Sequence, residues 1–128
     1  MRDLARNGLA IVAWLFVGCL IVQFFLAGLG VFDDPSAFVT HREFAYLFGW
    51  LTFVLVALAA LARAGRRMIG LAALTVLLMI LQSVFVAVRA DYPAIAALHP
   101  VNGVALLLVA IVLARSAWAA RSGVPGTA

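Results

Sequence analysis

The fold is decided by residues 8–32, which read GLAIVAWLFVGCLIVQFFLAGLGVF. This stretch contains no charged residue, and its one strongly polar side chain is Gln23. An α-helix needs about 20 consecutive apolar residues to cross the roughly 30 Å hydrocarbon layer of a bilayer. The length and composition of this stretch therefore predict a transmembrane helix.

Three more apolar stretches of similar length follow, at residues 41–62, 68–88 and 94–118. Lipid cannot hydrogen-bond to the backbone, so each stretch is expected to form a helix, which satisfies its own backbone groups. Short links join the stretches, and short links make successive helices antiparallel neighbours. The sequence predicts an all-α membrane protein: one domain at residues 1–121, with four transmembrane helices in an up-down-up-down bundle, and a disordered tail at residues 122–128.

The composition agrees with lipid as the solvent. Of the 128 residues, 67% are hydrophobic and only 11% are charged, whereas soluble domains carry about 25% charged residues. The nine basic residues are all Arg and are scattered between apolar stretches, so nucleic-acid binding is not expected. No acid–base pair, nucleophile–base arrangement or phosphate-binding loop is present. The sequence therefore favours a role other than catalysis but leaves the question of an enzymatic activity open.

The arginines also predict an orientation. An antiparallel bundle places seven of them on one side of the membrane and two on the other. The seven are Arg2, Arg6, Arg63, Arg66, Arg67, Arg115 and Arg121, and the two are Arg42 and Arg89. Because Arg accumulates in short cytoplasmic loops, we expect a protein of the bacterial cytoplasmic membrane with both termini in the cytoplasm.

The two halves of the chain share a pattern of rare residues. Segment 35–41 reads PSAFVTH and segment 93–99 reads PAIAALH, so each begins with Pro and ends with His. Gln23 precedes the first segment by twelve residues, and Gln82 precedes the second by eleven. The chain holds only these two Gln and these two His. Chance recurrence is the alternative, but the shared register favours duplication of one helical hairpin, of the kind found as parallel repeats in membrane proteins.

Duplication places His41 and His99 at the same ends of the second and fourth helices, which stand diagonally across a four-helix bundle. With neighbouring axes about 8–10 Å apart, this diagonal is roughly 12–14 Å. Two histidines facing across it can ligate one haem iron from opposite sides, so we predict haem b with both histidines as metal ligands. Zinc fits less well because it takes four ligands. Without a cofactor, the histidines would be interfacial and bonded to water, headgroups or loop carbonyls.

Polar and small residues near the histidines fit a bound ring. Gln23 and Gln82 lie within apolar stretches and should face the bundle interior. Gly28 leaves space against which a flat ring can pack. Asn102, about one turn after His99, is expected to orient that imidazole.

Arg42 and Arg89 lie on the arginine-poor side. Their guanidinium groups suit haem propionates through paired hydrogen bonds, and snorkelling to lipid phosphate is the alternative. Two starts are open for the second helix. Pro35 follows an acidic residue, as a first-turn Pro follows a cap, whereas Thr40 and Glu43 have the spacing of a capping box, which predicts a start at His41.

Two resemblances rest on these residues. VQFFLAGLG at 22–30, His41-Arg42 and ALHPVN at 97–102 resemble the signature of an uncharacterised family of small bacterial four-helix membrane proteins, a domain of unknown function. This resemblance implies the architecture alone.

The second resemblance is distant and is to one four-helix half of haem A synthase, whose halves hold haem between histidines of opposing helices. His41, Arg42, Gln82 and His99 are the matching positions. That family has a Glu a few residues before its first His, whereas this chain has Ala-Phe-Val-Thr at 37–40. The resemblance therefore implies haem binding without the oxidation chemistry.

We expect a bilayer-embedded haem protein that exchanges electrons with quinone or a respiratory-chain partner. A membrane accessory subunit or scaffold without a cofactor is the alternative. A small transporter is less favoured because no predicted helix carries a charge in its middle.

Overall fold

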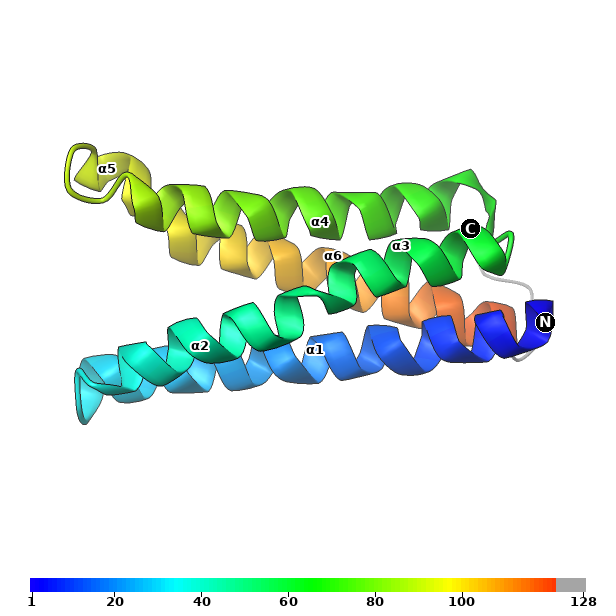
Figure 1. Ribbon diagram of the computed structural model, residues 1–128, viewed down its shortest axis with the longest axis horizontal. Helices are drawn as coiled ribbons and strands as arrows, with labels where there is room; N and C mark the ends of the chain where they lie inside the picture. Colours follow the sequence, from blue (N-terminus) through cyan, green and yellow to red (C-terminus); the bar gives the residue numbers. More distant parts are fainter. Residues whose placement is uncertain (122–128) are drawn as a thin grey trace.

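The computed structural model describes residues 1–121, and the predicted tail at residues 122–128 lies outside this part. Four spans cross the length of the molecule (Figure 1). They are α1 (Arg2–Phe32), α2 (Ala37–Gly49) continued by α3 (Leu51–Leu61), α4 (Gly65–Ala87), and α5 (Pro93–Ala96) continued by α6 (Leu98–Arg121). Each span is long and apolar enough to cross a membrane. The prediction of four transmembrane helices is confirmed.

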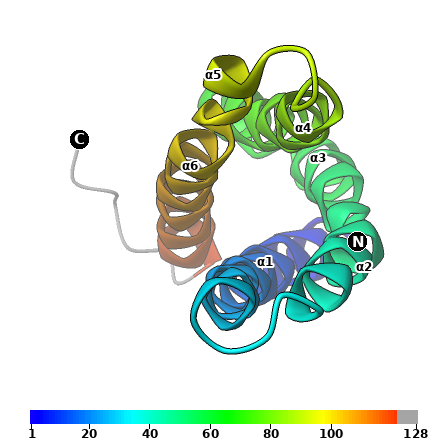
Figure 2. The ribbon, with the colours of Figure 1, turned by 90° about the vertical axis from the view of Figure 1, so that its left-hand side faces the viewer.

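Successive spans lie antiparallel and side by side. α1 packs against α2, α3 and α6, and α4 packs against α3 and α6. The spans therefore follow one another around the bundle axis, with α2–α3 diagonally opposite α6 (Figure 2). This arrangement confirms the predicted up-down-up-down bundle. We call the end with the α3–α4 link the arginine-rich end, and the end with the α1–α2 link and α5 the histidine end.

The second span begins at Ala37, earlier than the capping box predicts. The Asp34 carboxylate accepts hydrogen bonds from the Ser36 backbone N–H at 2.8 Å and from the Ser36 hydroxyl at 2.6 Å, which closes the turn before the helix. These two bonds lower the pKa of Asp34 below its ordinary value. Thr40 and Glu43 lie inside α2, so the predicted start at His41 is wrong.

A break at Trp50 divides α2 from α3. The Thr52 hydroxyl donates to the carbonyl of Gly49 at 2.8 Å, and such back-bonding to the preceding turn bends helices. The bend leaves α2 packed on α1, while α3 contacts both α1 and α4. In Figure 1, α2 accordingly diverges from α4 toward the histidine end.

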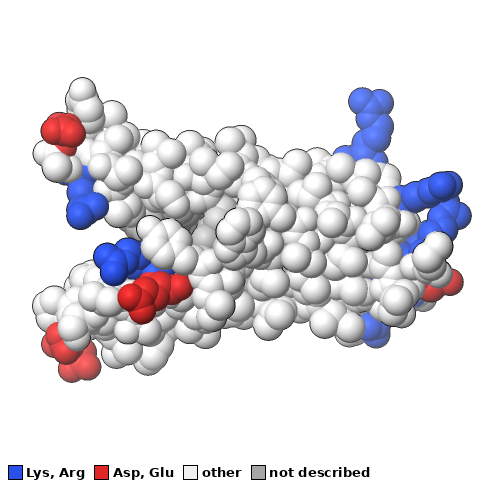
Figure 3. All heavy atoms as spheres, in the orientation of Figure 1, with Lys and Arg blue, Asp and Glu red and all other residues white. Residues whose placement is uncertain are grey.

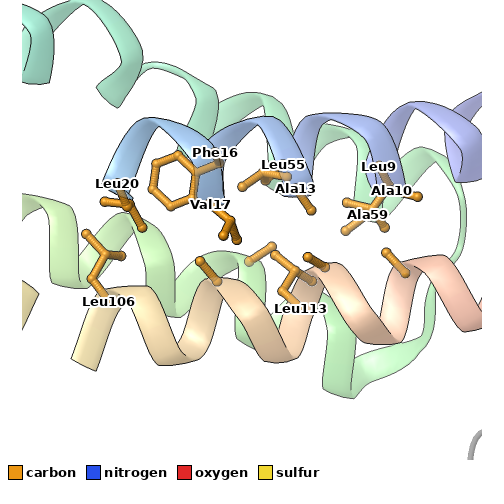
Figure 4. Close-up of a cluster of buried hydrophobic side chains, with 14 of the residues drawn as sticks. Leu9, Ala10, Ala13, Phe16, Val17, Leu20, Leu55, Ala59, Leu106 and Leu113 are labelled. Atoms are coloured by element: carbon orange, nitrogen blue, oxygen red, sulfur yellow. The ribbon is translucent and has the colours of Figure 1, made fainter. Parts of the chain in front are cut away.

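The buried core lies mainly in the arginine-rich half. Its largest fully buried apolar side chains come from α1, α3 and α6 and are Leu9, Phe16, Leu55, Leu106 and Leu113 (Figure 4). Alanines of α1, α3, α4 and α6 bring the helices close together, as is common in membrane bundles. The core continues as far as Leu20, Phe48 and Thr75.

Beyond that level the helices bury little. Between residues 21 and 32, α1 buries only Gly30, and residues 76–87 of α4 include no buried position. α2 buries Phe48 alone. Figure 3 shows the surface hollowed at this end, with positively charged side chains on both walls. The histidine end therefore opens into a wedge-shaped cleft between the α1–α2 hairpin and the α4–α6 side of the bundle. We call this cleft the wedge.

Candidate functional site

The two histidines meet in this wedge. His41 lies in the second turn of α2, and His99 lies at the start of α6. The centroids of their imidazole rings are 6.2 Å apart, and the ring planes are inclined by 63°. Both side chains are half-buried. The structure thus brings together the residues that the sequence singled out as a pair.

Each imidazole is held by the other helix of its own hairpin. Nδ1 of His41 lies 3.1 Å from the backbone carbonyl oxygen of Gln23, and Nδ1 of His99 lies 3.2 Å from that of Gln82. A carbonyl oxygen only accepts, so Nδ1 must carry the proton in both rings. In a neutral imidazole the lone pair then belongs to Nε2, which is the tautomer that metal-ligating histidines use. Neither Nε2 has a hydrogen-bond partner among the described residues.

The repeated contact also makes the proposed duplication visible in three dimensions. In each hairpin, a carbonyl near the end of the first helix accepts from a histidine near the start of the second. The two glutamine side chains, however, bond differently. Nε2 of Gln23 donates to the His41 carbonyl at 2.9 Å, whereas Oε1 of Gln82 accepts from Nδ2 of Asn102 at 2.9 Å.

Asn102 does not contact His99, contrary to the sequence-based expectation. Its Nδ2 donates to Oε1 of Gln82 and to the carbonyl of Leu78, at 2.9 Å in each case. Asn102 therefore ties α6 to α4 and supports His99 indirectly, through the helix whose carbonyl holds the imidazole. The spacing of one helical turn between His99 and Asn102 places Asn102 near the site, but it does not determine which acceptors the Asn102 side chain reaches.

We expect Asn102→Leu to lower the free energy of unfolding by about 1 kcal/mol, because interhelical polar bonds in membranes contribute roughly 0.6 kcal/mol each. Part of that cost comes from leaving Gln82 Oε1 unpaired, so adding Gln82→Leu should recover some of it. A double-mutant cycle followed by SDS unfolding measures this coupling. Strictly additive losses would contradict the proposed role of the Asn102–Gln82 bond.

Two glycines near the site permit close packing. A Cβ on Gly30 would lie 2.8 Å from the ring of Phe38, which itself meets the His41 ring edge-on at a centroid distance of 6.4 Å. A Cβ on Gly103 would lie 3.0 Å from Nε2 of Gln82. By contrast, a Cβ on Gly28 would have nothing within 4 Å. Gly30 and Phe38 thus belong to the surroundings of His41. The sequence did not single them out, because Gly30 lies in a stretch of small residues and Phe38 is one apolar residue among many.

Arg42 and Arg89 lie at the histidine end and are exposed. Arg42 makes one long ion pair, 3.9 Å to Glu43, in which both side chains are mostly solvent-accessible. Arg89 donates to the carbonyl of Val86 at 3.0 Å. Such contacts are weak, so both guanidinium groups can rearrange toward an anionic group at the mouth of the wedge.

The ligand set of the site is small. Among residues 1–121, no three His, Cys, Asp or Glu side chains come together in a way that could hold a metal ion. One buried acceptor is also left over: Oε1 of Gln23 has no hydrogen-bond partner in the described part of the chain. The pair therefore offers two imidazole nitrogens, and the side-chain oxygen of Gln23 lies buried beside it.

Taken together, the fold and the site define a multi-pass membrane protein, a four-helix bundle with a facing pair of histidines at one end. The chain belongs to DUF6220, a family of unknown function, whose match covers residues 23–89 and so more than half of the 128 residues. This range includes His41, Arg42, Gln82 and Arg89 but ends before His99. No curated protein and no solved structure matches the chain, and the resemblance to haem A synthase stays a prediction.

Proposed function

We propose that this protein binds one b-type haem between His41 and His99 and uses it to transfer electrons within the membrane. The observation that carries the proposal is the pair of imidazoles, 6.2 Å apart, whose Nε2 atoms are both unbonded within the described residues. Haem supplies one-electron chemistry at its iron when it is bound between two such ligands.

The spacing supports this assignment. With a metal–nitrogen distance of about 2 Å and a ring centre about 1.2 Å behind the nitrogen, imidazoles on opposite sides of one metal have centroids about 6 Å apart. The separation of the two rings agrees with that value. Zinc is disfavoured because it would need further protein ligands, and no suitable group of three or more lies within residues 1–121.

The residues around the pair have distinct tasks in this proposal. The carbonyls of Gln23 and Gln82 fix the tautomer and orientation of the imidazoles. Arg42 and Arg89 hold propionates at the polar mouth of the wedge, where paired hydrogen bonds to a carboxylate are strongest.

The surroundings also favour an electron-transfer role over a catalytic one. If His41 and His99 both held the iron, no protein-free position on it would remain for a substrate. A quinone or a respiratory-chain partner in the membrane can exchange electrons at the edge of the ring. The seven arginines of the opposite end favour a cytoplasmic location for that end, and in that orientation the haem would lie toward the outer face of the bacterial cytoplasmic membrane.

An absorption spectrum of the protein purified from haem-replete cells tests the proposal. We expect a sharp Soret band, resolved α and β bands on reduction, and the low-spin electron paramagnetic resonance signal of two axial imidazoles. A pyridine haemochrome assay should give one haem b per chain. A folded, colourless protein that takes up no added haemin would refute haem binding and favour the accessory-subunit alternative.

A further inference from the structure

A second candidate site lies at the opposite end of the bundle. A half-open cavity of about 160 Å³ lies between α1, the α3–α4 link, α4 and α6. Arg6 and Arg63 line it, together with apolar side chains that include Leu9, Met68 and Ala117. Cavities of about 150 Å³ hold a six-membered ring, so this one has room for a phosphate group. Neither the histidine pair nor the proposed haem uses it.

The cavity is electropositive. At this end of the described chain Asp3 is the one acidic residue, against seven arginines. Its carboxylate lies 3.7 Å from the Arg6 guanidinium, and the Asp3 side chain is 92% exposed. Such a pair is screened by water and contributes little. No ion pair is formed by Arg63 within residues 1–121, so the cavity presents two guanidinium groups to an anion.

The backbone at Arg63 is strained. Arg63 has φ of 49°, the one positive φ among the described non-glycine residues. The bonds from Ala64 N–H to the Ala59 carbonyl and from Arg63 N–H to the Ala60 carbonyl, both 3.0 Å, form a Schellman motif that ends α3. Glycine is usual at this position. Arg63 therefore holds this position at a cost in backbone energy that glycine would avoid.

The depth of the cavity fits a lipid headgroup. Trp118 lies on α6 beside the lining residue Ala117, and the Arg121 guanidinium is stacked over its ring at 4.0 Å. Trp residues favour the boundary between hydrocarbon and headgroups. The arginines are exposed while Leu9 is buried, so the cavity has a polar mouth and an apolar floor.

We propose that this cavity binds the phosphate group of an anionic phospholipid. Arg6 and Arg63 hold the phosphate oxygens, and the acyl chains lie in the lipid outside the cavity. Basic pockets between transmembrane helices are known to take anionic headgroups in this way. The proposal is independent of haem binding.

Native mass spectrometry of the full chain, released from nanodiscs of equal phosphatidylglycerol and phosphatidylethanolamine, tests the proposal. We expect one phosphatidylglycerol to stay bound, and Arg6→Gln with Arg63→Gln to weaken its retention about thirtyfold. Arg66→Gln with Arg67→Gln is the matched control, since it removes the same charge from exposed positions that do not line the cavity. The control should retain the lipid as the parent does.

Arg63→Gly separates binding from folding. Glycine suits a positive φ, so this variant should melt no earlier than the parent and still lose retained phosphatidylglycerol. Equal losses in both double variants, or full retention in Arg63→Gly, would overturn the proposal. Incubation of lipid-stripped protein with inorganic phosphate distinguishes the source of the anion. If phosphate is retained in a way that depends on Arg6 and Arg63, and no lipid is retained, the cavity is a site for free phosphate and the lipid is overturned as its occupant.

Discussion

Replacing either histidine of the pair by alanine is expected to abolish stable haem binding. His41→Ala and His99→Ala each remove one of the two proposed ligands, and among the described residues no third His, Cys, Asp or Glu joins the pair in a group that could hold a metal. Loss of an outer-shell partner alone weakens a metal site by about 10- to 100-fold, so loss of a ligand should cost at least as much. The measurement is the Soret absorbance per mole of purified chain. Any haem that remains bound to the variants is expected to be high-spin.

Two controls make this result specific. Thr40→Ala alters an exposed neighbour of His41 that makes no side-chain hydrogen bond in the described structure, and it should keep the full spectrum. His99→Ala also removes the Nδ1 bond to Gln82, so the elution volume and thermal unfolding of each variant must be recorded. An unchanged Soret band in both alanine variants would contradict ligation by this pair.

A ligand exchange gives a readout that a merely structural histidine would not change. His99→Met keeps a side chain able to ligate iron, and an axial thioether raises the reduction potential of a haem relative to two imidazoles. We expect the variant to retain some haem with a higher midpoint potential in a redox titration. His99→Met protein with the parent potential would show that residue 99 is not an axial ligand.

The span architecture could be predicted from the sequence because it depends on composition alone. An uncharged stretch such as residues 8–32 has few alternatives in lipid, and short links leave little freedom in the order of the spans. Of the two starts open for the second span, the one at His41 is wrong because Thr40 and Glu43 have the spacing of a cap but lie inside α2. The bonds within the Asp34–Ser36 turn, which allow the helix to begin at Ala37, depend on side-chain geometry.

For the site too, the sequence predicts some features, and others depend on the packing of the helices. Recurrence of Gln and His indicated the pair, but the bend at Trp50 has no clear signal in an apolar run and comes from a local contact between Thr52 and Gly49. That bend lays α2 on α1 and helps to open the wedge in which the rings meet. The bonds of Asn102 depend equally on the relative rotation of α4 and α6. Periodicity restricts such rotations, but only the packed structure sets them.

Truncation of a large side chain in the buried core is expected to destabilise the bundle. Phe16 is fully buried on α1 and packs against Phe48 at a ring-centroid distance of 5.7 Å. Lipid is as apolar as a protein core, so truncating Phe16 loses packing and little transfer energy. Phe→Ala removes about 100 Å³, and at about 24 cal/mol per Å³ of cavity the loss is about 2 kcal/mol. We expect Phe16→Ala to lower the free energy of unfolding by this amount in an SDS titration.

Phe25→Ala is the matched control, because it deletes the same atoms from the same helix at a position that is 63% exposed. Lipid refills the space beside an exposed side chain, so this variant should change the unfolding free energy by less than about 0.5 kcal/mol. The difference in unfolding free energy between Phe16→Ala and Phe25→Ala tests whether the packing of α1 in the arginine-rich half contributes most of its stabilisation. Equal losses in the two variants would mean that the histidine end is packed as tightly as the core, and that the wedge is absent from the folded protein in a bilayer.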